Sequence, residues 1–150
     1  MDTFTGARPA EIRSGAAIRR GGLVPAGLVG AGISLIVVVG LIHLIGSPED
    51  FAGGSYQGFL FLANFVGALA AAVGIYRGNR WGWALGLLVA VGSFVGYVIS
   101  RTVGLPGLPV EEEWLEPLGV LSMIVEILFV GSFLAIFVRP KKETTQGGRS

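Results

Sequence analysis

Four long apolar segments constrain the fold of this chain more than any other feature. They cover residues 23–45, 56–76, 81–100 and 117–138, and short polar connections separate them. An apolar helix of about 20 residues crosses the roughly 30 Å hydrocarbon core of a bilayer, and it satisfies its own backbone hydrogen bonds there. We therefore expect an all-α integral membrane protein, a four-helix bundle in which each segment is one span.

The composition leaves little room for a separate water-soluble domain. Of the 150 residues, 52% are hydrophobic and 14% are charged. We expect one membrane domain at residues 23–138, flanked by basic tails at residues 1–22 and 139–150. The chain has no cysteine, which excludes disulfides, thiolate metal sites and cysteine nucleophiles.

The charges are sorted between alternate connections. Ten of the eleven Lys and Arg residues lie before the first segment, between the second and third, or after the fourth, and Arg101 is the exception. Acidic residues occupy the other two connections: Glu49, Asp50, Glu111, Glu112, Glu113 and Glu116. The positive-inside rule then predicts a multi-pass protein of the cell membrane with both termini cytoplasmic. Aromatic residues are expected at the inner interface (Tyr76, Trp81, Trp83) and at the outer one (Trp114).

The two acidic connections have different local signals. Ser47, followed by Pro48 and two acids, predicts a capped helical turn that is separate from the first span. Residues 101–116 contain two glycines and two prolines, which favour an irregular outer loop that ends where Pro117 begins the fourth span.

Small residues gather on one face of the second and third segments. Helices in lipid associate through close backbone approach and side-chain hydrogen bonds, so these faces should meet other helices. The glycines expected at helix contacts are Gly67, Gly74, Gly82, Gly86 and Gly96. A third stripe, expected to pack in the same way, runs along the first segment through Gly27, Gly30, Ala31 and Ser34.

Glu126 is the most unusual residue of the apolar segments. It lies nine residues after Pro117, so about 13 Å into a bilayer, where a carboxylate costs roughly 2.5 to 3.5 kcal/mol to insert. Asn64 and Ser93 should lie at a similar depth, and Ser122 should lie one turn nearer the outside, on the same helix face as Glu126. One interpretation is a polar layer, open to the outside, that binds an ion, a proton or a small polar ligand. The other is an uncharged Glu126 that shares hydrogen bonds with Asn64 or Ser93 and holds three helices in register.

Two further residues are candidates for this layer. His43 is expected to be a hydrogen-bonding residue near the outer interface, because a single histidine supplies only one imidazole ligand to a metal or haem site. Arg101 is expected to form an exposed ion pair with the loop acids, of little energetic value, rather than to reach Glu126. The candidate ligand-binding set is thus Glu126, Asn64, Ser93, Ser122, His43 and Arg101, with no catalytic residue, metal or cofactor expected.

The last third of the chain resembles a known group of proteins. The residues that carry the resemblance are Arg101, Thr102, Val103, Gly104, Leu105, Pro106 and Gly107, followed by Glu113, Trp114, Glu116 and Pro117. They resemble uncharacterised small four-helix membrane proteins from bacteria and archaea with GC-rich genomes. The resemblance covers about the last third of the chain. It implies four spans and nothing about chemistry.

These observations favour a non-enzymatic structural or accessory subunit of a membrane, with lipid and a homo-oligomer or larger complex as partners and no nucleic acid. The first alternative is an ion, proton or small-solute transport component that uses Glu126 and Asn64. The second is an enzyme or redox protein that uses His43 and Glu126. Whether the two helical hairpins are a true repeat stays open.

Overall fold

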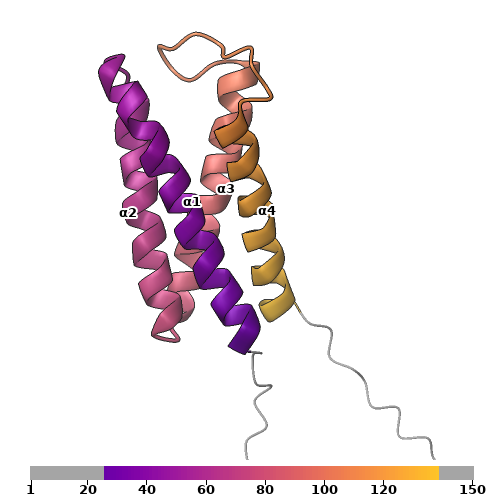
Figure 1. Ribbon diagram of the computed structural model, residues 1–150. Coiled ribbons are helices and arrows are strands. Elements are labelled where there is room, and N and C mark those ends of the chain that lie inside the picture. Colours follow the sequence, from indigo (N-terminus) through magenta and orange to yellow (C-terminus); the bar gives the residue numbers. More distant parts are fainter. Residues whose placement is uncertain (1–25, 139–150) are drawn as a thin grey trace, which may run out of the picture.

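The computed structural model describes residues 26–138, which form four α-helices (Figure 1). They are α1 (Ala26–Ala52), α2 (Gln57–Tyr76), α3 (Arg80–Thr102) and α4 (Pro117–Phe137). Each helix is long and apolar enough to cross a membrane. The expected basic tails and the first three residues of the expected first span lie outside the described residues.

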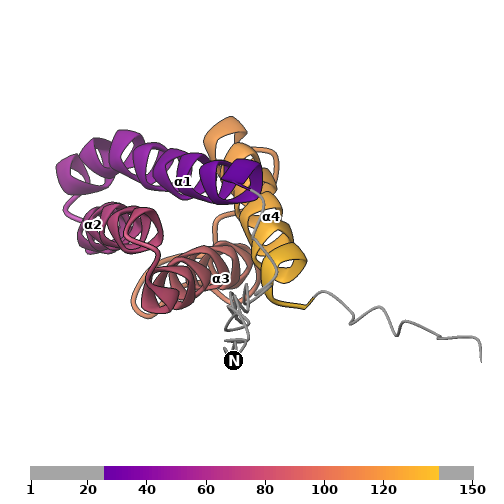
Figure 2. The same ribbon diagram turned by 90° about the horizontal axis from the view of Figure 1, so that it is seen from below.

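The helices alternate in direction and form a ring (Figure 2). Each helix packs against the next, α4 packs back against α1, and α1 and α3 lie diagonally opposite with little contact. We call the end that carries residues 77–79, between α2 and α3, the turn end. The opposite end, which carries residues 53–56 and 103–116, is the loop end.

The prediction of a separate turn at Ser47 is wrong, because α1 continues without interruption to Ala52. Pro48 lies inside the helix and has no N–H to donate to the carbonyl of Leu44, four residues earlier. The hydroxyl of Ser47 donates to that same carbonyl at 2.9 Å. Ser47 therefore supplies the hydrogen bond that Pro48 cannot make, and it does not cap a new helix.

The turn half of the bundle is closely packed. Gly82 lies so near the backbone of Gly74 and Ile75 that a side chain at this position would collide with α2. Trp83 is 6% exposed and stacks on Phe129 of α4, with ring centroids 5.7 Å apart. The expectation that Trp83 marks a membrane interface is therefore wrong. Its indole fills the space between α1, α3 and α4.

The other predicted packing glycines fall into two groups. A side chain at Gly67 would touch Val89 at 3.0 Å, and one at Gly86 would collide with Phe129. Gly96 differs from the expectation, since no described atom other than those of its chain neighbours and of the nearby α3 backbone lies within 4 Å of the position that its Cβ would occupy. It lines open space inside the bundle.

The small-residue stripe of α1 does not pack as expected. Gly27, Gly30, Ala31 and Ser34 are all exposed. The packed face of α1 instead carries Gly32, Ile36, Val39 and Gly40. Gly32 approaches the indole of Trp83, and Gly40 approaches Ala68 of α2.

The hairpin of α1 and α2 diverges from the hairpin of α3 and α4 toward the loop end (Figure 1). Buried apolar residues fill the turn half, where Trp83, Phe129 and Ile75 lie. The loop half holds a cavity instead.

Candidate functional site

A cavity of about 510 Å³ lies between the four helices in the loop half of the bundle. This volume is within the range of small-molecule sites in proteins, about 300 to 1,000 Å³. All four helices and the loop 103–116 contribute to its wall. The six polar residues selected from the sequence all line it: His43, Asn64, Ser93, Arg101, Ser122 and Glu126.

Glu126 is almost completely buried in this wall, with 2% of its surface exposed. One oxygen of its carboxyl group accepts a hydrogen bond from Ser122, one turn earlier in α4, at 2.8 Å. Within residues 26–138 neither Asn64 nor Ser93 bonds to it, so the expected link between helices through Glu126 is not found. No cation of these residues pairs with it either, because both ion pairs there belong to Arg101.

Asn64 and Ser93 bond to each other across α2 and α3. The hydroxyl of Ser93 donates to the carbonyl of Val89 at 2.9 Å and accepts from the amide nitrogen of Asn64. Since the single hydroxyl proton is used, the amide has to present its NH₂ group to Ser93. The amide oxygen Oδ1 is then left buried, with no partner among the described residues. Such a group is costly unless something bonds to it.

His43 lies on the cavity wall of α1. Its Nδ1 is 2.9 Å from the carbonyl of Val39, and its ring meets the ring of Phe61 edge to face at 5.2 Å. A carbonyl partner requires Nδ1 to carry the proton, so Nε2 is the acceptor in the neutral ring.

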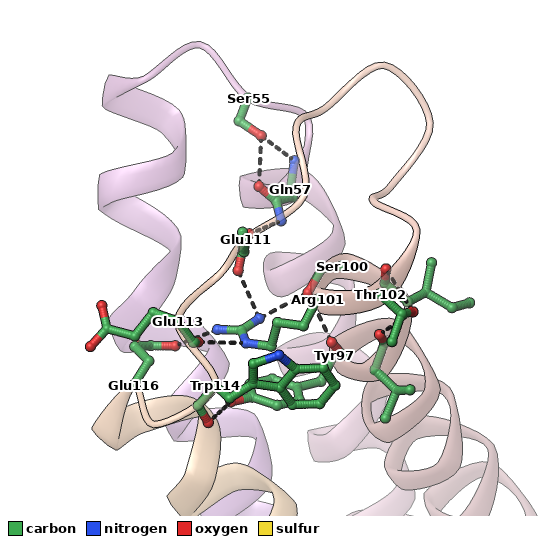
Figure 3. Close-up of polar contacts among 12 residues, drawn as sticks. Ser55, Gln57, Tyr97, Ser100, Arg101, Thr102, Glu111, Glu113, Trp114 and Glu116 are labelled. Carbon is green, nitrogen blue, oxygen red and sulfur yellow. Dashed lines mark hydrogen bonds and ion pairs between the residues drawn. The ribbon is translucent and has the colours of Figure 1, made fainter.

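Arg101 lines the loop end of the cavity, and Figure 3 shows its contacts. Its guanidinium is 2.7 Å from a carboxylate oxygen of Glu111 and 3.2 Å from one of Glu116. It also donates to the carbonyl of Glu113 at 3.0 Å and to the hydroxyl of Ser100 at 2.8 Å. The guanidinium lies over the ring of Tyr97, 3.7 Å from the centroid.

Arg101 thus pairs with the loop acids, as expected, but the pair is not an exposed one. Only 8% of its surface is accessible. A buried guanidinium with this many partners holds the loop 103–116 in one conformation.

Two side chains at the start of α2 tie the same loop to the other hairpin. Gln57 donates to the carboxylate of Glu111 at 3.0 Å, and the hydroxyl of Tyr56 donates to the carbonyl of Pro106 at 3.0 Å. Sequence reasoning did not select Gln57, Glu111 or Glu116 as site residues. One signal in the sequence could have identified Gln57: it lies on the small, polar face of the second segment.

The cavity reaches the surface at the loop end, where the side chains of Glu111 and Glu116 line it and are 40% and 44% exposed. Leu60 of α2 and Leu88 of α3 also line it and are 50% and 70% exposed. The opening at the loop end is therefore acidic, whereas the exposed part of the wall on α2 and α3 is apolar.

Comparisons of this chain with protein-family models, with curated proteins and with solved structures found no match. In the part of the chain that the structure describes, no group of three or more His, Cys, Asp or Glu residues is placed to hold a metal ion.

Proposed function

We propose that this chain is a multi-pass membrane protein that binds a small solute in the cavity between its helices, as a component of a transport or uptake process. The observation that supports this most is the position of Glu126, Asn64 and Arg101. They come from three helices, and all line one cavity. Buried polar groups that converge on an otherwise apolar cavity are typical of small-molecule sites.

The proposal includes an orientation. The loop end carries the acids of two connections, whereas Arg77 and Arg80 lie at the turn end. The positive-inside rule then places the turn end and both termini in the cytoplasm. The cavity consequently opens to the outside of the cell.

A structural or accessory subunit is the competing proposal. It is supported by the closely packed turn half, where Gly82 approaches Gly74 and Trp83 stacks on Phe129. Such a subunit needs no ligand in the cavity. The two proposals therefore differ in whether a small molecule binds there.

Binding of 1-naphthylmethanol, a neutral aromatic alcohol, separates the two proposals. The purified protein in bilayer discs should bind this probe with saturation, measured by equilibrium dialysis. Gly96→Phe should abolish the saturable part, because Gly96 lines the cavity and has free space around it that a phenyl ring would fill.

Gly131→Phe is the matched control. Gly131 is exposed on α4, does not line the cavity and has equally free surroundings. It should bind the probe as the parent does. If both variants lose the saturable binding equally, or if neither loses it, the result would contradict a site in this cavity. It would favour the accessory subunit.

A further inference from the structure

Glu126 has unused hydrogen-bonding capacity in the cavity wall. Its carboxyl group receives one hydrogen bond, from Ser122, and has no cationic partner within residues 26–138. The Oδ1 atom of Asn64 receives none, but neighbouring atoms cover it. A ligand that satisfies the carboxylate of Glu126 has to bring N–H or O–H donors.

A positive charge on the ligand would offset the cost of burying a carboxylate at Glu126. An ion in an apolar site is expensive unless it is paired, and a charge-assisted hydrogen bond is roughly twice as strong as a neutral one. An ammonium group donates up to three hydrogen bonds from one centre.

The rest of the wall is apolar, and it includes the ring of Phe61 and the side chains of Val89 and Met123. Aromatic faces also attract cations. The exposed apolar side chains of Leu60 and Leu88, which line the cavity, would face lipid in the proposed orientation. An apolar body that carries the charge is therefore favoured over a small inorganic ion.

The acidic opening is compatible with the same charge. The guanidinium of Arg101 is already shared between two carboxylates, Glu111 and Glu116. One cation and two anions leave this end of the cavity with an excess of negative charge. Among residues 26–138, an anionic ligand would find no unpaired cation lining this end of the cavity.

We propose that the ligand is an amphiphilic organic cation, whose ammonium group pairs with Glu126 while its apolar body fills the cavity. This inference rests on the proposed solute-binding function and names the chemical class of the solute.

Three probes with one ring system test this proposal: 1-naphthylmethylamine, 1-naphthylmethanol and 1-naphthoate. At neutral pH they carry a positive charge, no charge and a negative charge. In equilibrium dialysis with the protein in bilayer discs, the amine should bind about tenfold more tightly than the alcohol. The carboxylate should show no saturable binding. Binding that Gly96→Phe retains is assigned to the lipid and subtracted.

Glu126→Gln then tests the role of the carboxylate, with Glu112→Gln as the matched control. Glu112 is an exposed loop acid that does not line the cavity. Glu126→Gln should bring the affinities of amine and alcohol together, whereas Glu112→Gln should leave the preference for the amine unchanged.

Each other outcome has a defined meaning. If the alcohol shows saturable binding that Gly96→Phe removes, but the amine binds no more tightly, the ligand class is wrong and the solute-binding function stands. If a preference for the amine persists in Glu126→Gln, Glu126 is not its partner and the proposal is overturned. If no probe binds, the solute-binding function fails as well. The comparison of the three probes uses the parent protein, so it remains decisive even if Glu126→Gln does not fold.

Discussion

Arg101 and Glu126 are two ionisable side chains that the fold buries in different ways. Arg101 contacts two carboxylates, a backbone carbonyl, a hydroxyl and an aromatic ring. Glu126 receives one hydrogen bond, from Ser122. The first arrangement is saturated and therefore structural. The second leaves binding capacity unused, which is the basis for assigning Glu126 to a ligand site.

The stability of the loop 103–116 against local opening should depend on the shape of the Arg101 side chain as well as on its charge. Lys can keep one ion pair, but it lacks the planar fork that bonds to Glu111 and Glu113 while stacking on Tyr97. In Arg101→Lys, backbone amides of residues 103–116 should exchange hydrogen about tenfold faster, measured by mass spectrometry, because local opening costs less.

Arg77→Lys is the control for this change, since Arg77 is exposed at the turn end. It should leave exchange in the loop at the parent rate. If Arg101→Lys also left it there, the loop would be held mainly by Gln57 and Tyr56 from α2, contrary to the role given to Arg101.

The candidate residues themselves could be selected from the sequence, because a polar side chain inside an apolar segment is conspicuous. Their hydrogen-bond and ion-pair partners could not be selected in this way. Glu126 and Ser122 lie one turn apart on one helix, whereas the bond between Asn64 and Ser93 depends on how α2 and α3 are rotated about their axes. The burial of Arg101 depends on the path of the loop, which no periodicity in the sequence encodes.

At the scale of the helices, glycine position separates contact from free space. Gly82 lies against the backbone of α2, which cannot move aside. Gly92, on the same helix, has nothing within 4 Å of its Cβ position among the described residues. The same residue type therefore serves close packing in one half of α3 and leaves room in the other half.

Replacing each of these glycines with alanine tests the packing of α2 on α3. Gly82→Ala should lower the free energy of unfolding by about 1 to 3 kcal/mol, because the added methyl group collides with Gly74 and Ile75. Gly92→Ala should leave it unchanged or raise it by up to about 1 kcal/mol, since alanine is the better helix former. Reversible unfolding in mixed detergent micelles gives both values. Equal losses in the two variants would contradict the close contact at Gly82.

The sequence predicts the four helices, but it predicts only in part which face of each helix packs against its neighbours. The small, polar faces of α2 and α3 do turn inward, with Ala71, Gly74, Gly82 and Gly86 buried. In α1 the stripe that begins at Gly27 turns outward. Glycine is frequent in this chain, with 25 residues, so stripes of small residues arise on more than one face of a helix. The face of α1 that packs is the one with Gly32 and Gly40, which approach Trp83 and Ala68.

The whole molecule is a bundle whose turn half is closely packed and whose loop half contains a cavity. Four apolar segments are enough to predict a four-helix bundle, whereas the packing of α4 back against α1, which completes the ring, was not predicted. The cavity is not predictable in this way, because it arises from the divergence of two hairpins and from the loop that spans them (Figure 1).

The proposed orientation can be tested with single cysteines, since the chain has none of its own. In intact cells, Leu108→Cys in the loop 103–116 should react with a membrane-impermeant thiol reagent. Asn79→Cys at the turn end should not react until the membrane is opened. The reverse pattern would place the loop end and the cavity on the cytoplasmic side.

The central claim, that a cavity accessible to water lies inside this bundle, is tested most directly by thiol reactivity at Gly96. A charged thiol reagent dissolves in water and not in lipid, so in bilayer discs it reports water alone. Gly96→Cys lines the cavity and should react. Val91→Cys, on the outer face of the same helix, and Ala68→Cys, in the packed core, should not react. A Gly96→Cys protein as unreactive as the other two would contradict the cavity and the functions proposed for it.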